Sequence, residues 1–119
     1  MKQTDMQMAV RIPRSLIDRV GAHIVALRKA RGSRITRAMW INNIISVELL
    51  LHRAKPLQAP ASGQPSRNDF KLTIRITPRD LETLDGVVSE WIMYTGADHS
   101  RSSVVREILS RNLEHKEHA

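Results

Sequence analysis

Residues 71–78 read KLTIRITP, and residues 7–13 read QMAVRIP. In both stretches every second residue is a large apolar one, and the residues between them are small, polar or charged. This strict alternation is typical of a β-strand with one buried and one exposed face. Pro13 and Pro78 follow, and proline is common where a strand ends and a helix begins. The sequence therefore predicts two short strands, each leading into a helix.

The two stretches belong to an internal repeat with an offset of 64 residues. Shifting the chain on itself by that distance, without a gap, brings identical residues together at Arg11/Arg75, Ile12/Ile76, Gly32/Gly96, Arg37/Arg101, Ile44/Ile108, Ser46/Ser110 and Leu49/Leu113. The order of apolar and polar positions agrees more widely than these identities do. We therefore expect both halves to share one fold.

Each half continues with two segments of helical periodicity. The apolar stripes of the first half are Ile17, Val20, Ile24 and Leu27, then Trp40, Ile41, Ile44, Ile45 and Leu49. Those of the second half are Leu81, Leu84, Val88 and Trp91, then Val104, Val105, Ile108, Leu109 and Leu113. Gly32 and Gly96 are expected to end the first helices in the left-handed conformation. Thr36 and Ser100 are the candidate N-caps of the second helices.

The chain divides into a first repeat (1–54), a linker (55–68) and a second repeat (69–119). The linker holds three prolines and a glycine, which exclude a helix or a central strand. One repeat has a single strand, which cannot satisfy its own backbone, and little core. We therefore expect a mainly α fold in which the two strands pair as an antiparallel ribbon over four helices, making one compact domain. The alternative is a four-helix bundle with two unpaired extended segments.

Composition restricts the partners and the chemistry. The 119 residues include 19 Lys and Arg against 12 Asp and Glu, a net charge of +7, which favours nucleic acid or an anionic membrane surface. No apolar run approaches the roughly 18 residues of a membrane span, and the N-terminal segment lacks the apolar core of a signal peptide. Aromatic residues, the usual stacking platforms for single-stranded bases, make up only 3%, which favours duplex DNA.

Nothing in the sequence indicates an enzyme. There is no cysteine, which fits a reducing cytoplasm, and the five histidines lack metal-ligand spacing. Glycine-rich phosphate loops and nucleophile elbows are also missing from the sequence. We expect no catalytic residue, metal or cofactor.

The order strand, helix, Gly, Ser/Thr-led helix occurs in QMAVRIPRSLIDRV…RGSRITRAMWINNII and again in KLTIRITPRDLETL…TGADHSRSSVVREIL. It resembles the ribbon-helix-helix family of MetJ and Arc, whose members read DNA with a β-ribbon. Two copies on one chain resemble the tandem form seen in TraY of conjugative plasmids and in the overdrive-binding virulence protein of T-DNA transfer. The resemblance covers nearly all of the chain except the linker and the ends. It implies a monomer that folds as an internal pseudodimer, acts near a transfer origin or border, and assists a relaxase or another DNA-processing protein.

The polar face of the two strands is the candidate site for reading bases. A two-stranded ribbon fits the major groove, where Arg and Lys recognise guanine, Gln recognises adenine, and Thr or Ala contacts a thymine methyl. The candidate base-reading residues are Gln7, Ala9, Arg11, Lys71, Thr73 and Arg75. The alternative is that this face is only the solvated side of an edge ribbon.

Phosphate contacts are expected at the start of each second helix, where unpaired backbone N–H groups point outward. The candidates are Ser33, Arg34, Thr36, Arg37, Ser100 and Arg101. For Thr36 and Ser100 a capping role and a phosphate contact are both open. Residues 1–54 carry a net charge of +7 and residues 69–119 a net charge of −2, so we expect an asymmetric DNA site with more backbone contacts from the first half.

Three functions of different kinds remain open. The first is an accessory DNA-binding protein of plasmid conjugation or T-DNA processing, located in the bacterial cytoplasm with the nucleoid or a plasmid. The second is a transcriptional repressor of copy-control or antitoxin type. The third is a protein-interaction module without a DNA role. Cooperative binding along DNA is a further expectation from the family resemblance.

Overall fold

Two strands and four helices make up the part of the chain that the computed structural model describes, residues 5–32, 34–52, 54–60 and 70–117. The elements are β1 (Met6–Ile12), α1 (Arg14–Arg31), α2 (Arg37–Leu51), β2 (Phe70–Ile76), α3 (Pro78–Thr95) and α4 (Arg101–Glu117). Each element of the second set begins 64 residues after its counterpart in the first. The expected mainly helical fold with one two-stranded antiparallel sheet is confirmed.

The two strands pair along their whole length. Ala9 lies opposite Thr73 at the centre, and the register runs from Met6 opposite Ile76 to Ile12 opposite Phe70. The alternating apolar residues of both strands, Met8, Val10, Ile12, Leu72, Ile74 and Ile76, are all buried. The strand pairing excludes a bundle with two separate extended segments.

The helices begin and end at the predicted capping residues. Gly32 and Gly96 end α1 and α3 with φ of 60° and 70°, in the left-handed region that favours glycine. The Thr36 hydroxyl caps α2 by accepting a hydrogen bond from the backbone N–H of Met39 at 3.1 Å. The Ser100 hydroxyl accepts one from the N–H of Ser103 at 3.3 Å. All four predicted caps are therefore confirmed as helix-ending or helix-starting residues.

The core lies between the ribbon and the helices, and most of the predicted apolar stripes line it. Four members of those stripes, Leu27, Ile44, Leu81 and Val88, are only half-buried. Two buried residues lay outside the predicted stripes, Leu16 in the first turn of α1 and Val87 in α3. The buried face of each first helix is therefore turned slightly from the predicted one, because each first helix packs against both α2 and α4.

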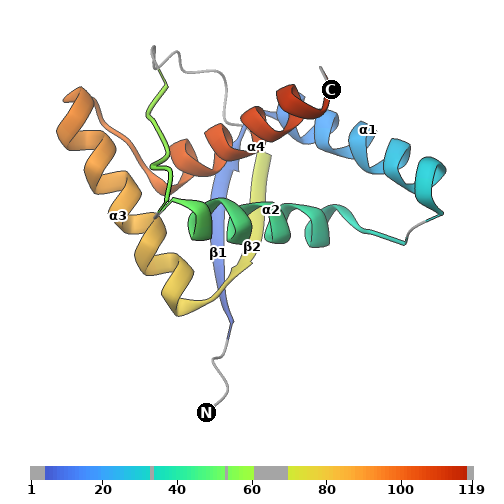
Figure 1. Cartoon of the computed structure of the whole chain (residues 1–119), viewed down its shortest axis with the longest axis horizontal. Coiled ribbons are helices and arrows are strands. Elements are labelled where there is room, and N and C mark those ends of the chain that lie inside the picture. The colour runs from blue at the N-terminus through green and yellow to red at the C-terminus, as the bar shows by residue number, and fades with distance from the viewer. Residues whose placement is uncertain (1–4, 33, 53, 61–69, 118–119) are drawn as a thin grey trace.

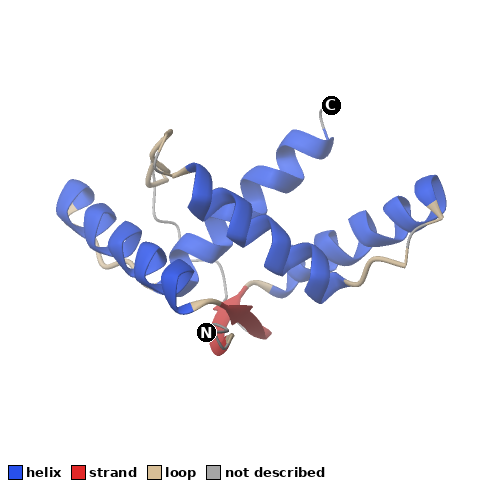
Figure 2. Cartoon of the chain, turned by 60° about the horizontal axis from the view of Figure 1, so that its bottom comes forward, coloured by secondary structure: helices blue, strands red, loops and turns tan. Residues whose placement is uncertain are grey.

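Each second helix contacts the strand of the other half, α4 against β1 and α2 against β2, and the two second helices contact each other. Figure 1 shows α2 and α4 crossing the ribbon, with α1 and α3 extending to opposite sides. In Figure 2 the strands project from one side of the helical layer. One face of the ribbon is therefore covered by helices and the other is open.

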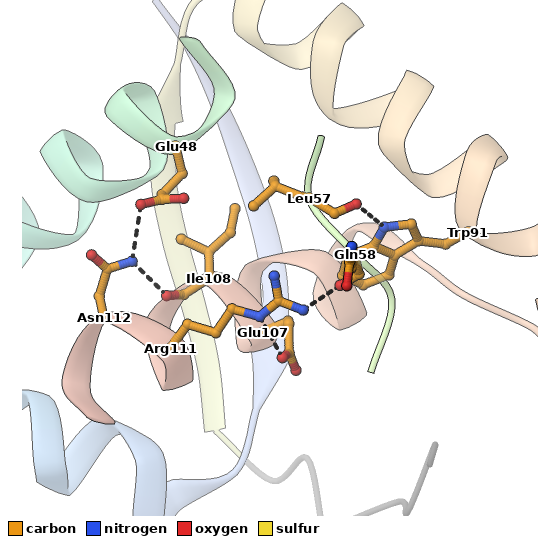
Figure 3. Close-up of polar contacts among 8 residues, drawn as sticks. All are labelled: Glu48, Leu57, Gln58, Trp91, Glu107, Ile108, Arg111 and Asn112. Carbon is orange, nitrogen blue, oxygen red and sulfur yellow. Dashed lines mark hydrogen bonds and ion pairs between the residues drawn. The ribbon is translucent and has the colours of Figure 1, made fainter. Parts of the chain in front are cut away.

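Part of the predicted linker packs against the helices. We call residues 54–60 the strap; the rest of the predicted linker, 61–68, lies outside the described residues. The Leu57 carbonyl accepts a hydrogen bond from Trp91 Nε1 at 3.1 Å, and its N–H donates to His52 Nδ1 at 3.0 Å. Arg111 donates to the carbonyl of Gln58 (Figure 3). The strap is thus fixed to α3 and α4 by its backbone, which a proline-rich composition did not predict.

Candidate nucleic-acid interface

The open face of the ribbon carries the six predicted base-reading residues. Gln7, Ala9, Arg11, Lys71, Thr73 and Arg75 are all exposed. The register places Arg11 opposite Lys71 and Gln7 opposite Arg75, on either side of the central pair. The structure thus brings all six predicted residues together on one surface.

This surface has an unbalanced charge. It presents three cations, and neither strand contains an Asp or Glu. Arg11 and Lys71 lie directly opposite each other, and like charges in that position destabilise a sheet. A surface of this kind suits a partner that supplies negative charge and hydrogen-bond acceptors.

The second helices hold the backbone of the two ribbon arginines. The N–H of Arg11 donates to Ser102 Oγ on α4 at 3.0 Å. The N–H of Arg75 donates to Asn42 Oδ1 on α2 at 3.3 Å. Without such side chains, the outward-facing N–H and C=O groups of a two-stranded sheet must form their hydrogen bonds with water or with another chain. These bonds fix the two arginines relative to the helices, and sequence reasoning missed both Ser102 and Asn42.

At the first-half end of the ribbon two arginines converge on one aromatic ring. The guanidinium of Arg37, at the start of α2, lies 5.4 Å from the centre of the Phe70 ring. The guanidinium of Arg14, at the start of α1, lies 5.7 Å from the same centre. Cation–π attraction of this kind limits the rotamers of both side chains. We call these three residues the arginine clamp; neither Arg14 nor Phe70 was among the predicted site residues.

The other predicted phosphate contacts of the first half precede Arg37 in the chain. Arg34 is exposed in the loop before α2. Thr36 serves as the N-cap of α2, so its hydroxyl is already engaged with the helix backbone. Ser33 lies outside the described residues.

The corresponding end in the second half is different. The positions that match Phe70 and Arg14 hold Met6 and Pro78. Arg101, which matches Arg37, forms a two-point ion pair with Asp85, with nitrogen–oxygen distances of 2.7 and 2.9 Å. The hydrogen bond from Arg101 lowers the pKa of Asp85, and the same bond raises the pKa of Arg101. Asp85 thus neutralises at this end a charge that Arg37 keeps at the other.

Ser100 is likewise occupied with its own helix. Its hydroxyl accepts from the N–H of Ser103, and its N–H donates to the Ser103 hydroxyl at 3.2 Å. These reciprocal bonds cap α4 on their own. A phosphate contact at this end would have to use the remaining N–H groups of the first turn.

Other kinds of site find little support in the described residues. There, no three His, Asp or Glu side chains come together as a metal site would require. Within the same ranges, none of the helices has the length and apolar character to span a membrane.

Comparison of the chain with models of known families, with curated proteins and with solved structures gave no match in any of the three.

Proposed function

We propose that this chain is a sequence-specific double-stranded DNA-binding protein of the ribbon-helix-helix type, with both halves of the usual dimer on one chain. The observation that carries the proposal is the open ribbon face, on which every predicted base-reading residue is exposed while the residue that follows each of them is buried. A solvated edge ribbon would not require cations opposite each other or helices that hold the backbone of both arginines.

The contacts between matching residues support a two-fold relation of the halves. Ala9 pairs with Thr73, and these positions are 64 residues apart. At the far side of the helical layer Asn112 Nδ2 lies 3.5 Å from Glu48 Oε1, again across 64 positions (Figure 3). In a two-fold arrangement, a residue can contact its own counterpart in the other half only if both lie close to the axis. A two-fold axis relating the halves would pass close to both contacts, and so through the ribbon.

The ribbon has the shape and chemistry for the major groove, which admits a two-stranded ribbon and displays a distinct pattern for each base pair. Arg11 and Arg75 are assigned to guanine O6 and N7, Lys71 to guanine and Gln7 to adenine. Thr73 and Ala9, at the centre, are assigned to thymine methyl groups. The arginine clamp is assigned to a backbone phosphate on the first-half side, together with Arg34.

The biological setting remains a proposal from the family resemblance. It is that of an accessory factor in plasmid conjugation or T-DNA processing, acting in the bacterial cytoplasm beside a relaxase. The alternative is a transcriptional repressor. The chain is not assigned any catalytic activity.

Selection of bound duplexes from a random pool tests the proposal. We expect one enriched motif, with binding that weakens steeply as salt rises. The variant with Arg11→Ala and Arg75→Ala should lose the motif while it keeps the fold by circular dichroism. The matched control, Lys29→Ala with Arg31→Ala, also removes two exposed cations but lies outside the ribbon, and should select the wild-type motif. Recovery of no motif, or of the same motif from both double variants, would contradict a ribbon that reads bases.

A further inference from the structure

A run of cations without any acid occupies the outer part of the first half. Residues 19–47 contain six Arg and Lys residues and no Asp or Glu. The matching residues of the second half, 83–111, contain three Arg residues and four Asp and Glu residues. Because matching helices occur in both halves, the fold itself does not require this difference in charge. The difference points to an anionic partner that meets only the first half.

The cations gather where α1 ends and the loop to α2 begins. Lys29 and Arg31, in the last turn of α1, and Arg34, in the loop, are all exposed. The Nε of Arg28 donates a hydrogen bond to the carbonyl of Ile35 at 2.9 Å, which holds this loop beside the helix. Among the described residues, none of the three exposed cations has a carboxylate partner. We call Lys29, Arg31 and Arg34 the cationic corner.

The helix dipole does not account for this corner. Cations in a last turn do stabilise the negative end of a helix. However, α3 also ends at a left-handed glycine, and its last turn has no basic residue. Arg34 lies beyond the end of α1, where the effect of the dipole has fallen off, and Asp98 takes its place in the second half. The corner therefore carries more charge than the stability of the helix requires.

The corner lies on a side of the ribbon toward which bound DNA would continue. A ribbon in the major groove crosses the duplex, which then extends away on both sides of it. Figures 1 and 2 show α1 extending from the ribbon to one side of the molecule and α3 to the other. The 18 residues of α1 span about 27 Å at about 1.5 Å per residue. This length corresponds to roughly eight base pairs at about 3.4 Å each, so the corner is within reach of the flank next to the ribbon's site.

We propose that the cationic corner binds the sugar–phosphate backbone of the same duplex, on the first-half flank outside the base-reading site. The inference rests on the proposed function, because the ribbon must first place the duplex. In Figure 2 the last turn of α1 lies farther from the ribbon than its first turn, so the flank bends toward the helical layer to meet it. Counterions released from the neutralised phosphates offset the elastic cost of this bend. The second-half flank meets Met93 and Asp98 at the matching positions and gains no such contact.

Binding to duplexes with unequal flanks tests the inference. A short duplex holds the selected motif with minimal flanks, and two longer ones each add about ten base pairs, one helical turn, to one side or to the other. The variant Lys29→Gln with Arg31→Gln removes most of the charge of the corner. The matched control, Lys55→Glu, changes the net charge by the same amount but lies on the strap. All three side chains are exposed, so both variants should keep the wild-type circular dichroism spectrum.

For wild type and control, one longer duplex should bind more tightly than the short one, and the other should not. The gain should shrink by roughly 3.5-fold for each added phosphate contact between about 50 and 200 mM salt. The double variant should bind the short duplex about as tightly as wild type does and should lose the gain. Dyes at the two ends of the favoured longer duplex should come closer together with wild type than with the double variant.

The inference would be overturned by equal binding of the three duplexes, by equal gains from both flanks, or by a gain that the double variant keeps. An end-to-end distance that the double variant leaves unchanged would overturn it as well. In each of these cases specific binding to the short duplex persists, and the proposed function stands. Loss of specific binding by wild type to the short duplex would instead refute the proposed function, and the inference with it.

Discussion

At the scale of single residues, the proposed function depends most directly on Arg11 and Arg75. Each is exposed on the ribbon, and each has its backbone N–H held by a side chain of a second helix. We expect Arg11→Ala or Arg75→Ala to weaken specific binding by roughly 1–3 kcal/mol and to relax base preference at one position. Competition binding with single-base variants of the selected duplex measures both effects. Unchanged affinity in both variants would mean that the ribbon does not read the DNA.

Removing the Asp85–Arg101 ion pair should strengthen DNA binding, whereas removing a ribbon arginine should weaken it. Asp85 holds Arg101 away from the role that its counterpart Arg37 is assigned, and it adds a negative charge near the interface. We expect Asp85→Asn to tighten DNA binding and to steepen the dependence of log K on log salt by up to about one phosphate contact. Filter binding across a salt series checks this.

The control for that prediction is Glu82→Gln, which removes a carboxylate from an exposed position of the same helix. If both variants tighten binding equally, the cause is net charge and not the release of Arg101. Stability should change little in either case, because exposed ion pairs are typically worth about 0.2–1 kcal/mol.

At the scale of elements, two glycines of α3 should respond in opposite ways to the same substitution. Gly96 ends the helix at φ of 70°, where a Cβ is strained although it would meet no atom within 4 Å. Gly86 lies inside the helix and also has open space around it. We expect Gly96→Ala to lower the free energy of unfolding by about 1–2 kcal/mol and Gly86→Ala to raise it by up to about 1 kcal/mol. Chemical denaturation of both variants measures the difference, and equal signs would contradict the assigned helix end.

The elements themselves could be predicted well from the sequence, and the reason lies in their periodicity. Alternation located both strands and fixed which face is buried, and the caps at Gly32, Gly96 and Thr36 located the helix ends. Leu16 and Val87 were missed because their burial depends on how the first helices pack against α2 and α4. The strap was missed because its bonds run through backbone carbonyls, which Trp91 and Arg111 contact from distant positions. Composition carries no signal of such a contact.

In the candidate site, too, local sequence patterns predicted the exposed residues but not the contacts between distant side chains. The six ribbon residues follow from alternation alone, because one strand face is buried. The arginine clamp and the Asp85–Arg101 pair depend instead on side chains brought together by the fold. Nothing local to Phe70 or Arg14 indicates that they meet. The sequence could therefore predict which surface is open, but not which cations on its border remain available to a partner.

At the scale of the whole molecule, these border contacts make the two sides of the interface unequal. The first-half side has the arginine clamp and the exposed Arg34, whereas the second-half side has Met6, Pro78 and a neutralised Arg101. We expect phosphate-ethylation interference to be stronger on the side of the DNA site that faces the start of α2. A symmetric pattern would contradict this expectation.

Phe70→Leu makes the cause of that asymmetry testable. Leucine keeps an apolar side chain at the half-buried first position of β2 but removes the ring that holds Arg14 and Arg37. Both cations remain, so the salt dependence of binding should change little, whereas affinity should fall because two long side chains must now be ordered on binding. Arg14→Ala, in contrast, should reduce the salt slope by about one contact. If Phe70→Leu leaves affinity unchanged while Arg14→Ala lowers it, the ring is not what prepares the clamp for a phosphate, and the asymmetry comes from charge alone.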